Sequence, residues 1–154
     1  MFEYTHGNLV RQFKGMQVLE LLIEEEFAQL RNNKPQEITA TEFAIHELMR
    51  QLAVERLELR KMLGGKRLRE VMPMLSEEQQ ATLDTLLVEL DELEQRCARQ
   101  ASVNAKLALA LHDQSQSLIE YIQEQIKPKN QNTYGKKGRY AQTRPEAALI
   151  QGRL

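Results

Sequence analysis

The chain has 154 residues, with 21 Lys and Arg against 22 Asp and Glu; 42% of its residues are hydrophobic and only 5% are aromatic. A length in this range is typical of one domain. With no Trp, 7 Gly and 4 Pro, the composition favours a helical bundle or coiled coil over a β-sandwich, a barrel or a nucleotide-binding sheet. Cys97 is the single cysteine, so a framework of intrachain disulfides is excluded.

The N-terminal residues do not form a basic region followed by an apolar stretch, and no run of about 18 apolar residues occurs in the chain. Such features mark signal peptides and membrane-spanning helices. We therefore expect a cytoplasmic protein without membrane insertion.

The first predicted helix covers residues 9–30. Its apolar residues recur every seven positions, as in an amphipathic helix with one buried stripe: Leu9, Met16, Ile23 and Leu30. Pro35 disfavours helical geometry at the residue before it, so we expect this helix to end near residue 32.

The second predicted helix begins with the capping-box pattern Thr39-Ala40-Thr41-Glu42 and stops at Gly64-Gly65. Its stripe also has heptad spacing: Ile38, Ile45, Leu52 and Leu59. Glu55 and Arg56 interrupt this stripe, and we interpret them as its edge rather than as a buried ion pair.

A short helix is predicted over residues 66–75, with Pro73 ending it, and Ser76-Glu77-Glu78-Gln79 supplies a second capping box. No Gly or Pro follows until Pro128, and about 50 residues of helix would extend roughly 75 Å. Heptad spacing marks the stripe of this last helix: Leu83, Leu90, Cys97, Asn104, Leu111 and Leu118. The two shorter helices cannot cover all of it. We predict an all-α fold, an elongated antiparallel helical bundle or coiled coil with one long C-terminal helix that is partly uncovered.

Charge divides the chain near Pro128. Residues 1–127 carry 15 basic and 21 acidic side chains, whereas residues 128–154 carry 6 basic side chains and Glu146. We therefore expect a helical bundle domain over residues 1–127 and a flexible basic tail over residues 128–154. Within the tail, Tyr134 is followed by the permissive glycines Gly135 and Gly138 and is interpreted as an exposed recognition residue.

No pattern in the sequence indicates catalysis. A di-metal site in a helical bundle needs two Glu-x-x-His pairs on facing helices, and neither His46 nor His112 has a Glu three positions before it. Cys97 lies on the apolar stripe, where a cysteine usually acts as a small apolar residue. We expect a non-enzymatic protein without a metal or a cofactor.

Two features together resemble the FlgN family of flagellar export chaperones. One is the all-helical pattern with a long last helix, and the other is Lys127-Pro128 followed by Thr133-Tyr134-Gly135-x-x-Gly138. Asn104 also matches a family position, whereas Gln100 stands where another Asn is expected. The resemblance covers roughly residues 10–140.

This resemblance implies a type III export chaperone. Such a protein binds the terminal helices of hook-filament junction (hook-associated) proteins, prevents their premature oligomerisation and delivers them to the cytoplasmic domain of the flagellar export gate. It suggests gate docking by Tyr134, Gly135 and Gly138. We place the client surface on the part of the last stripe that the shorter helices cover least easily: Leu107, Leu111, Leu118, Ile119 and Ile122.

Two other interpretations stay open. The main alternative is a homodimeric coiled-coil structural or adaptor protein without an export client, because an Asn at a heptad core position can set the register of self-association. Weak self-association is also compatible with the chaperone. The interpretation favoured least is a nucleic-acid-binding regulator acting through the basic tail, whose binding would fall steeply with salt. The client and its stoichiometry are not predicted.

Overall fold

The computed structural model describes residues 1–127, and every long element in this range is helical. The elements are α1 (Phe2–Arg31), α2 (Pro35–Met62), the one-turn α3 (Leu68–Val71), the 3-10 helix η1 (Met72–Met74) and α4 (Glu77–Ile126). No strand occurs in the described range. The predicted all-α class and the long last helix are confirmed.

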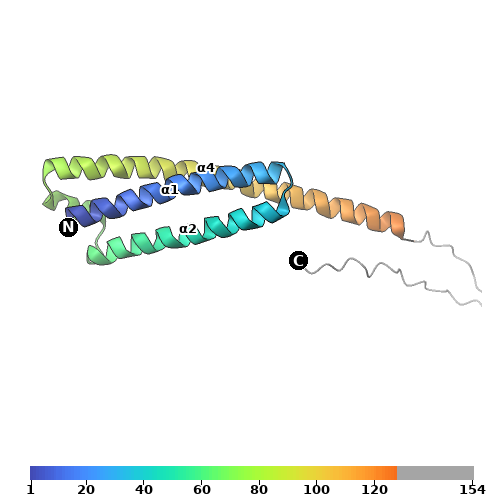
Figure 1. The fold of residues 1–154 in the computed structure, drawn as a ribbon, viewed down its shortest axis with the longest axis horizontal. Helices are drawn as coiled ribbons and strands as arrows, with labels where there is room; N and C mark the ends of the chain where they lie inside the picture. The colour runs from blue at the N-terminus through green and yellow to red at the C-terminus, as the bar shows by residue number, and fades with distance from the viewer. Residues whose placement is uncertain (128–154) are drawn as a thin grey trace, which may run out of the picture. The chain divides into compact units, whose positions relative to one another are not determined.

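The chain divides into two compact units, Met1–Ala108 and Leu109–Leu154. In the first unit α1 lies between α2 and α4, and α2 runs antiparallel to both (Figure 1). The second unit contains the last part of α4, of which residues 109–126 are described.

The core of the first unit is built from the predicted stripes. Heptad residues of α1 are all buried, as are those of α4 up to residue 104 and the later ones of α2: Leu9, Met16, Ile23, Leu30, Leu52, Leu59, Leu83, Leu90, Cys97 and Asn104. Gly15 lies where α1 meets α2, since a Cβ at this position would stand 2.8 Å from Leu52 Cδ2. The two helices therefore pack closely because this residue has no side chain.

Two predicted helix starts were wrong. The first helix begins at Phe2 rather than at residue 9. The apolar pattern did not reveal this start, because the polar residues Thr5 and Asn8 occupy the buried positions on its first turns. The second helix begins at Pro35, four residues before the predicted cap. Proline suits the first position of a helix, where its missing N–H would have no partner and its φ is already helical. Thr39 consequently lies one turn inside α2, where its hydroxyl donates to the Pro35 carbonyl (3.0 Å).

The connection between α2 and α4 follows the prediction more closely. Gly64 and Gly65 have φ of 63° and 81°, in the left-handed region that glycine adopts without steric cost, and they directly follow α2. Pro73 lies in η1, after α3 has ended at Val71. The Ser76 hydroxyl accepts from the Gln79 N–H (3.4 Å) and the Gln79 side chain accepts from the Ser76 N–H (3.3 Å), so the second capping box is confirmed.

Candidate functional site

The apolar stripe of α4 begins as core. Leu83, Leu90, Leu93 and Cys97 are at most 6% exposed and pack with residues of the other helices of the first unit. Along this part of α4 the stripe is used for folding. A partner could reach it only by opening the bundle.

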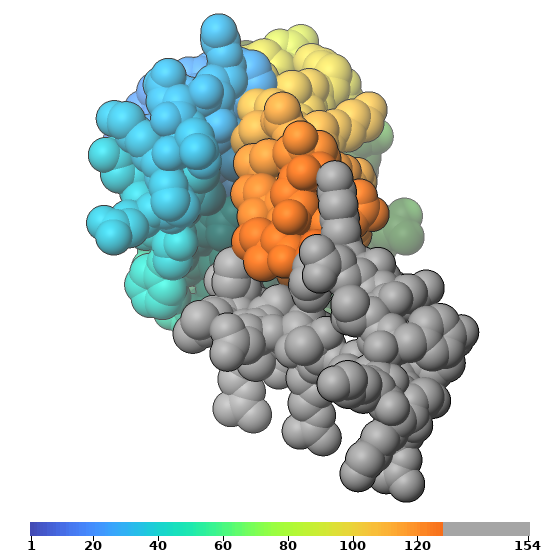
Figure 2. All heavy atoms as spheres, turned by 90° about the vertical axis from the view of Figure 1, so that its right-hand side faces the viewer, coloured from blue at the N-terminus to red at the C-terminus, as the bar shows by residue number. Residues whose placement is uncertain are grey.

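Beyond residue 111 the environment of the helix changes completely. Every residue from 112 to 127 is exposed, and Leu118, Ile119 and Ile122 are 58%, 40% and 42% exposed. Helical periodicity places them on the face that carries Leu90, Cys97 and Asn104 earlier in α4. Figure 2 shows this segment in orange at the molecular surface. The apolar stripe that is buried in the first unit therefore continues along α4 into the second unit, where its residues are exposed.

Two residues of the predicted client surface differ from the other three. Leu107 lies in the first unit and Leu111 in the second, and both are half-buried. Conversely, Tyr121 (60% exposed) and Ile126 (63% exposed) extend the apolar surface of the second unit, although the sequence analysis did not include them. Both could have been found from helical spacing, since Ile126 follows Ile122 by four residues and Tyr121 follows Leu118 by three.

Asn104 is the last buried residue of the stripe, at 3% exposure. Its side-chain amide donates to the Ile23 carbonyl (2.8 Å) and to the Glu26 carboxylate (2.7 Å), both on α1. Its own oxygen accepts from the Gln100 side chain (2.9 Å). A buried amide with these partners fixes the position of α4 along α1, because sliding either helix would leave its polar groups unpaired.

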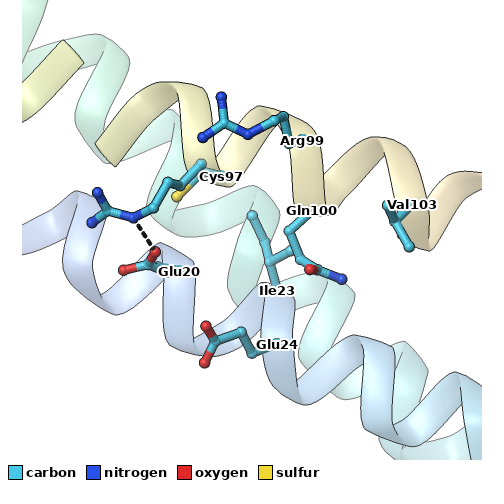
Figure 3. A pocket seen from close by; sticks show the side chains of 8 residues that line it. Glu20, Ile23, Glu24, Cys97, Arg99, Gln100 and Val103 are labelled. Carbon is cyan, nitrogen blue, oxygen red and sulfur yellow. Dashed lines mark hydrogen bonds and ion pairs between the residues drawn. The ribbon is translucent and has the colours of Figure 1, made fainter. Parts of the chain in front are cut away.

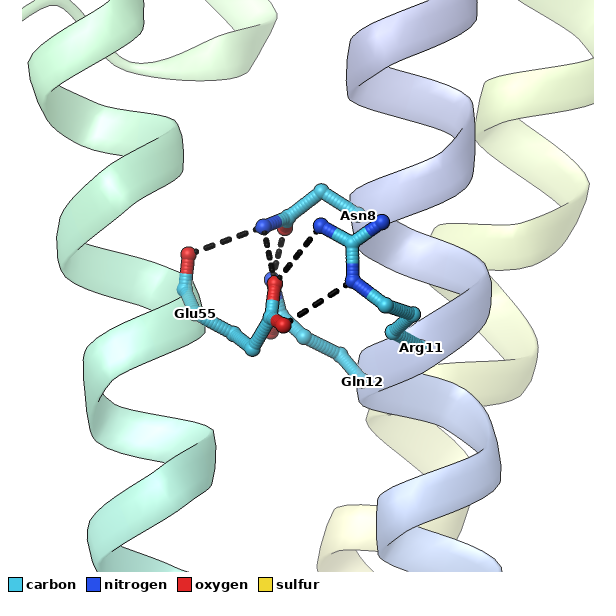
Figure 4. A network of polar contacts seen from close by, with 4 residues as sticks. All are labelled: Asn8, Arg11, Gln12 and Glu55. Atoms are coloured by element: carbon cyan, nitrogen blue, oxygen red, sulfur yellow. Dashed lines mark hydrogen bonds and ion pairs between the residues drawn. The ribbon is translucent and has the colours of Figure 1, made fainter.

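A second polar cluster joins α1 to α2 by the same kind of contact (Figure 4). The buried Asn8 amide donates to the Glu55 carbonyl (3.0 Å) and carboxylate (2.7 Å), and its oxygen accepts from Gln12 (2.6 Å). Arg11 forms a two-pronged ion pair with the Glu55 carboxylate at 2.9 Å, and this hydrogen bond raises the pKa of the guanidinium. Glu55 is half-buried and Arg56 exposed, as expected for the edge of the stripe. Arg56 forms an ion pair with Glu94 of α4, so the polar contacts in this region involve all three long helices.

The groove between α1 and α4 offers little for chemistry (Figure 3). It has a volume of about 330 Å³, and the ion pair of Arg96 with Glu20 (2.8 Å) forms part of its wall. Cys97 lines it but is 4% exposed, and burial raises the pKa of its thiol. A protonated, buried thiol is a poor nucleophile. Within residues 1–127 no group of three or more His, Cys, Asp or Glu side chains is placed to hold a metal ion.

The family model described as "FlgN protein" matches residues 1–142 of the chain. The chain belongs to the FlgN family. FlgN proteins are flagellar export chaperones, so the family membership agrees with the resemblance inferred from the sequence. No curated protein and no solved structure matches the chain.

Two further observations bear on this FlgN-family chain. No helix in residues 1–127 is long and apolar enough to cross a membrane. The predicted gate-docking residues Tyr134, Gly135 and Gly138 lie outside the described residues, although they are within the family match.

Proposed function

We propose that this chain is a cytoplasmic chaperone for hook-filament junction proteins. It binds their terminal helices and prevents their premature oligomerisation. The observation that carries the proposal is the exposed stripe of Leu118, Ile119 and Ile122 on the end of α4. Apolar residues at i, i+1 and i+4 on one helix face form a surface to which an amphipathic helix can bind.

Binding of a partner to the exposed stripe is favourable because it removes apolar side chains from water. A Leu or Ile side chain gains roughly 1.5 to 3 kcal/mol when it is fully buried, and within the described residues 1–127 every side chain of α4 after residue 111 is exposed. Leu107 and Leu111, half-buried, would form the inner end of the client surface. Tyr121 and Ile126 would widen it.

Delivery to the export gate is the second part of the proposal. We assign gate docking to Tyr134 with Gly135 and Gly138, following the family resemblance, and retain the division into a bundle domain (1–127) and a basic tail (128–154). An amphipathic tyrosine ring is well suited to an interface that is apolar on one side and hydrated on the other.

A homodimer is the competing explanation for the same stripe, since a second copy could cover it. Asn104 does not add support for this alternative, because its amide is already bonded to Ile23 and Glu26 of its own chain. Sedimentation equilibrium at micromolar concentration, with and without a terminal segment of a junction protein, separates the two. The chaperone should be monomeric alone and heavier by the mass of the segment when it is added. A stable dimer that ignores the segment would refute the proposal.

A further inference from the structure

The segment from the last turn of α2 to α3 carries an unusual density of positive charge. Residues 60–69, here called the basic connector, contain five cations and no acid: Arg60, Lys61, Lys66, Arg67 and Arg69. The rest of residues 1–127 has 10 basic and 21 acidic side chains. Residues 60–69 are therefore a strongly positive segment, whereas the rest of the described chain carries an excess of acidic side chains.

All five cations are exposed, and none of them forms an ion pair in the described part of the chain. Arg60 and Lys61 lie in the last turn of α2, where positive charge is favourable for the helix. That explanation does not extend to Lys66, Arg67 and Arg69, which follow the helix. Arg67 and Arg69 share a hollow with Asp91 and Glu92 of α4, but no bonded carboxylate neutralises them.

The shape of the connector indicates what it can bind. No atom lies within 4 Å of the position that a Cβ would take at Gly64 or Gly65, so the turn between the cations is open to solvent. The hollow that holds Arg67 and Arg69 is also lined by Asp91, Glu92 and Glu94, whose negative charge disfavours a small anion there. Met62 lies between Lys61 and Lys66 in sequence and is 37% exposed, and Met74 follows the last cation and is 76% exposed.

We propose that the basic connector docks the protein peripherally on an anionic phospholipid bilayer. Clustered Lys and Arg side chains are drawn to the negative surface potential of a membrane without needing matched partner geometry. Exposed apolar side chains beside the cations add contact with the interfacial region. The remainder of residues 1–127, with 10 basic and 21 acidic side chains, is repelled on balance by an anionic bilayer, which favours an orientation with the connector toward the membrane. This docking is independent of the client surface on α4.

Vesicle co-sedimentation of the full chain tests the proposal. Vesicles of phosphatidylglycerol and phosphatidylcholine are compared with pure phosphatidylcholine, at low salt and at about 1 M salt, where the Debye length falls to roughly 3 Å. The wild-type chain should bind only the anionic vesicles and be released by salt. Three substitutions define the connector variant, which should bind at least tenfold more weakly: Lys61→Glu, Lys66→Glu and Arg67→Glu.

The tail supplies a matched control of equal charge change: Lys136→Glu, Lys137→Glu and Arg139→Glu. This variant should keep vesicle binding within about threefold, and circular dichroism checks that both variants are folded. Equal losses in the two variants, or equal binding to neutral vesicles, would overturn the proposal. So would a wild-type chain that ignores anionic vesicles but binds a DNA oligonucleotide through the connector, which would assign this surface to nucleic acid.

Discussion

Asn104 offers a direct test of how α4 is held on α1. Asn104→Ala removes the hydrogen bonds to the Ile23 carbonyl and to the Glu26 carboxylate on α1, and also the one that the Gln100 side chain donates. A neutral hydrogen bond is worth about 0.5 to 1.5 kcal/mol and one to a charged group about 1.5 to 3 kcal/mol. From the two bonds to α1 alone, we therefore expect the free energy of unfolding to fall by about 2 to 4.5 kcal/mol, measured in urea denaturation followed by circular dichroism.

Two further variants sharpen this test. Ser102→Ala, at an exposed position of the same helix, is the control and should change the free energy of unfolding by less than about 0.5 kcal/mol. Asn104→Asp places a second carboxylate beside Glu26, which raises the pKa of the new group in the folded state. This variant should be less stable than Asn104→Ala at pH 7 and should regain stability as the pH falls and the new group is protonated. An Asn104→Ala protein as stable as the wild type would refute the proposed role of the amide.

Three other predictions concern separate features. Gly15→Val should destabilise the first unit by about 1 to 3 kcal/mol through overpacking between α1 and α2. Gly7→Ala, whose Cβ would meet only the end of the Arg11 side chain at an ordinary contact distance of 3.6 Å, should stabilise α1 by about 0.5 to 1 kcal/mol; equal effects in chemical denaturation would contradict the close packing at Gly15. Hydrogen bonding to Arg50 lowers the pKa of Glu47 to about 2, so stability from this pair is present above the unfolded pKa of about 4.3 and is lost as the pH falls toward 2. Carboxyl NMR should record that pKa and its return to the ordinary value in Arg50→Ala. Tyr134→Ala should leave client affinity unchanged and weaken binding to the export-gate domain at least tenfold in calorimetry; unchanged gate affinity would remove Tyr134 from the interface.

Heptad spacing predicted a large part of the apolar core of the first unit. Residues such as Leu9, Leu52 and Leu90 are buried because a helix brings every seventh residue to one face. Helix lengths predicted that part of the α4 stripe would stay uncovered, because two helices of about 30 residues are too short to pack along all of a helix of 50 residues.

The polar contacts between helices could not be predicted in this way. Asn8 and Glu55 are 47 positions apart and Asn104 and Ile23 are 81 apart, so no local pattern connects them. Buried polar residues such as Asn8 also interrupted the apolar stripe and concealed the start of α1. Pro35 misled for a related reason, because the same residue disfavours the helix before it and begins the helix after it. The basic connector was visible in the sequence, but only the structure shows that its cations are exposed and unbonded.

The central claim is that the exposed stripe at the end of α4 binds the client. Leu118 and Ile122 are 58% and 42% exposed, so a client that covers both would bury the equivalent of about one full side chain. Burial of one such side chain is worth roughly 1.5 to 3 kcal/mol, or about 10- to 100-fold in affinity. Calorimetric titration with a terminal segment of a hook-filament junction protein should show at least this loss for Leu118→Asp/Ile122→Asp, with helicity retained. The matched control Val18→Asp/Leu21→Asp, at positions of α1 that are 49% and 65% exposed, should bind as the wild type does. A double variant on α4 that is folded and binds the segment with unchanged affinity would contradict the account.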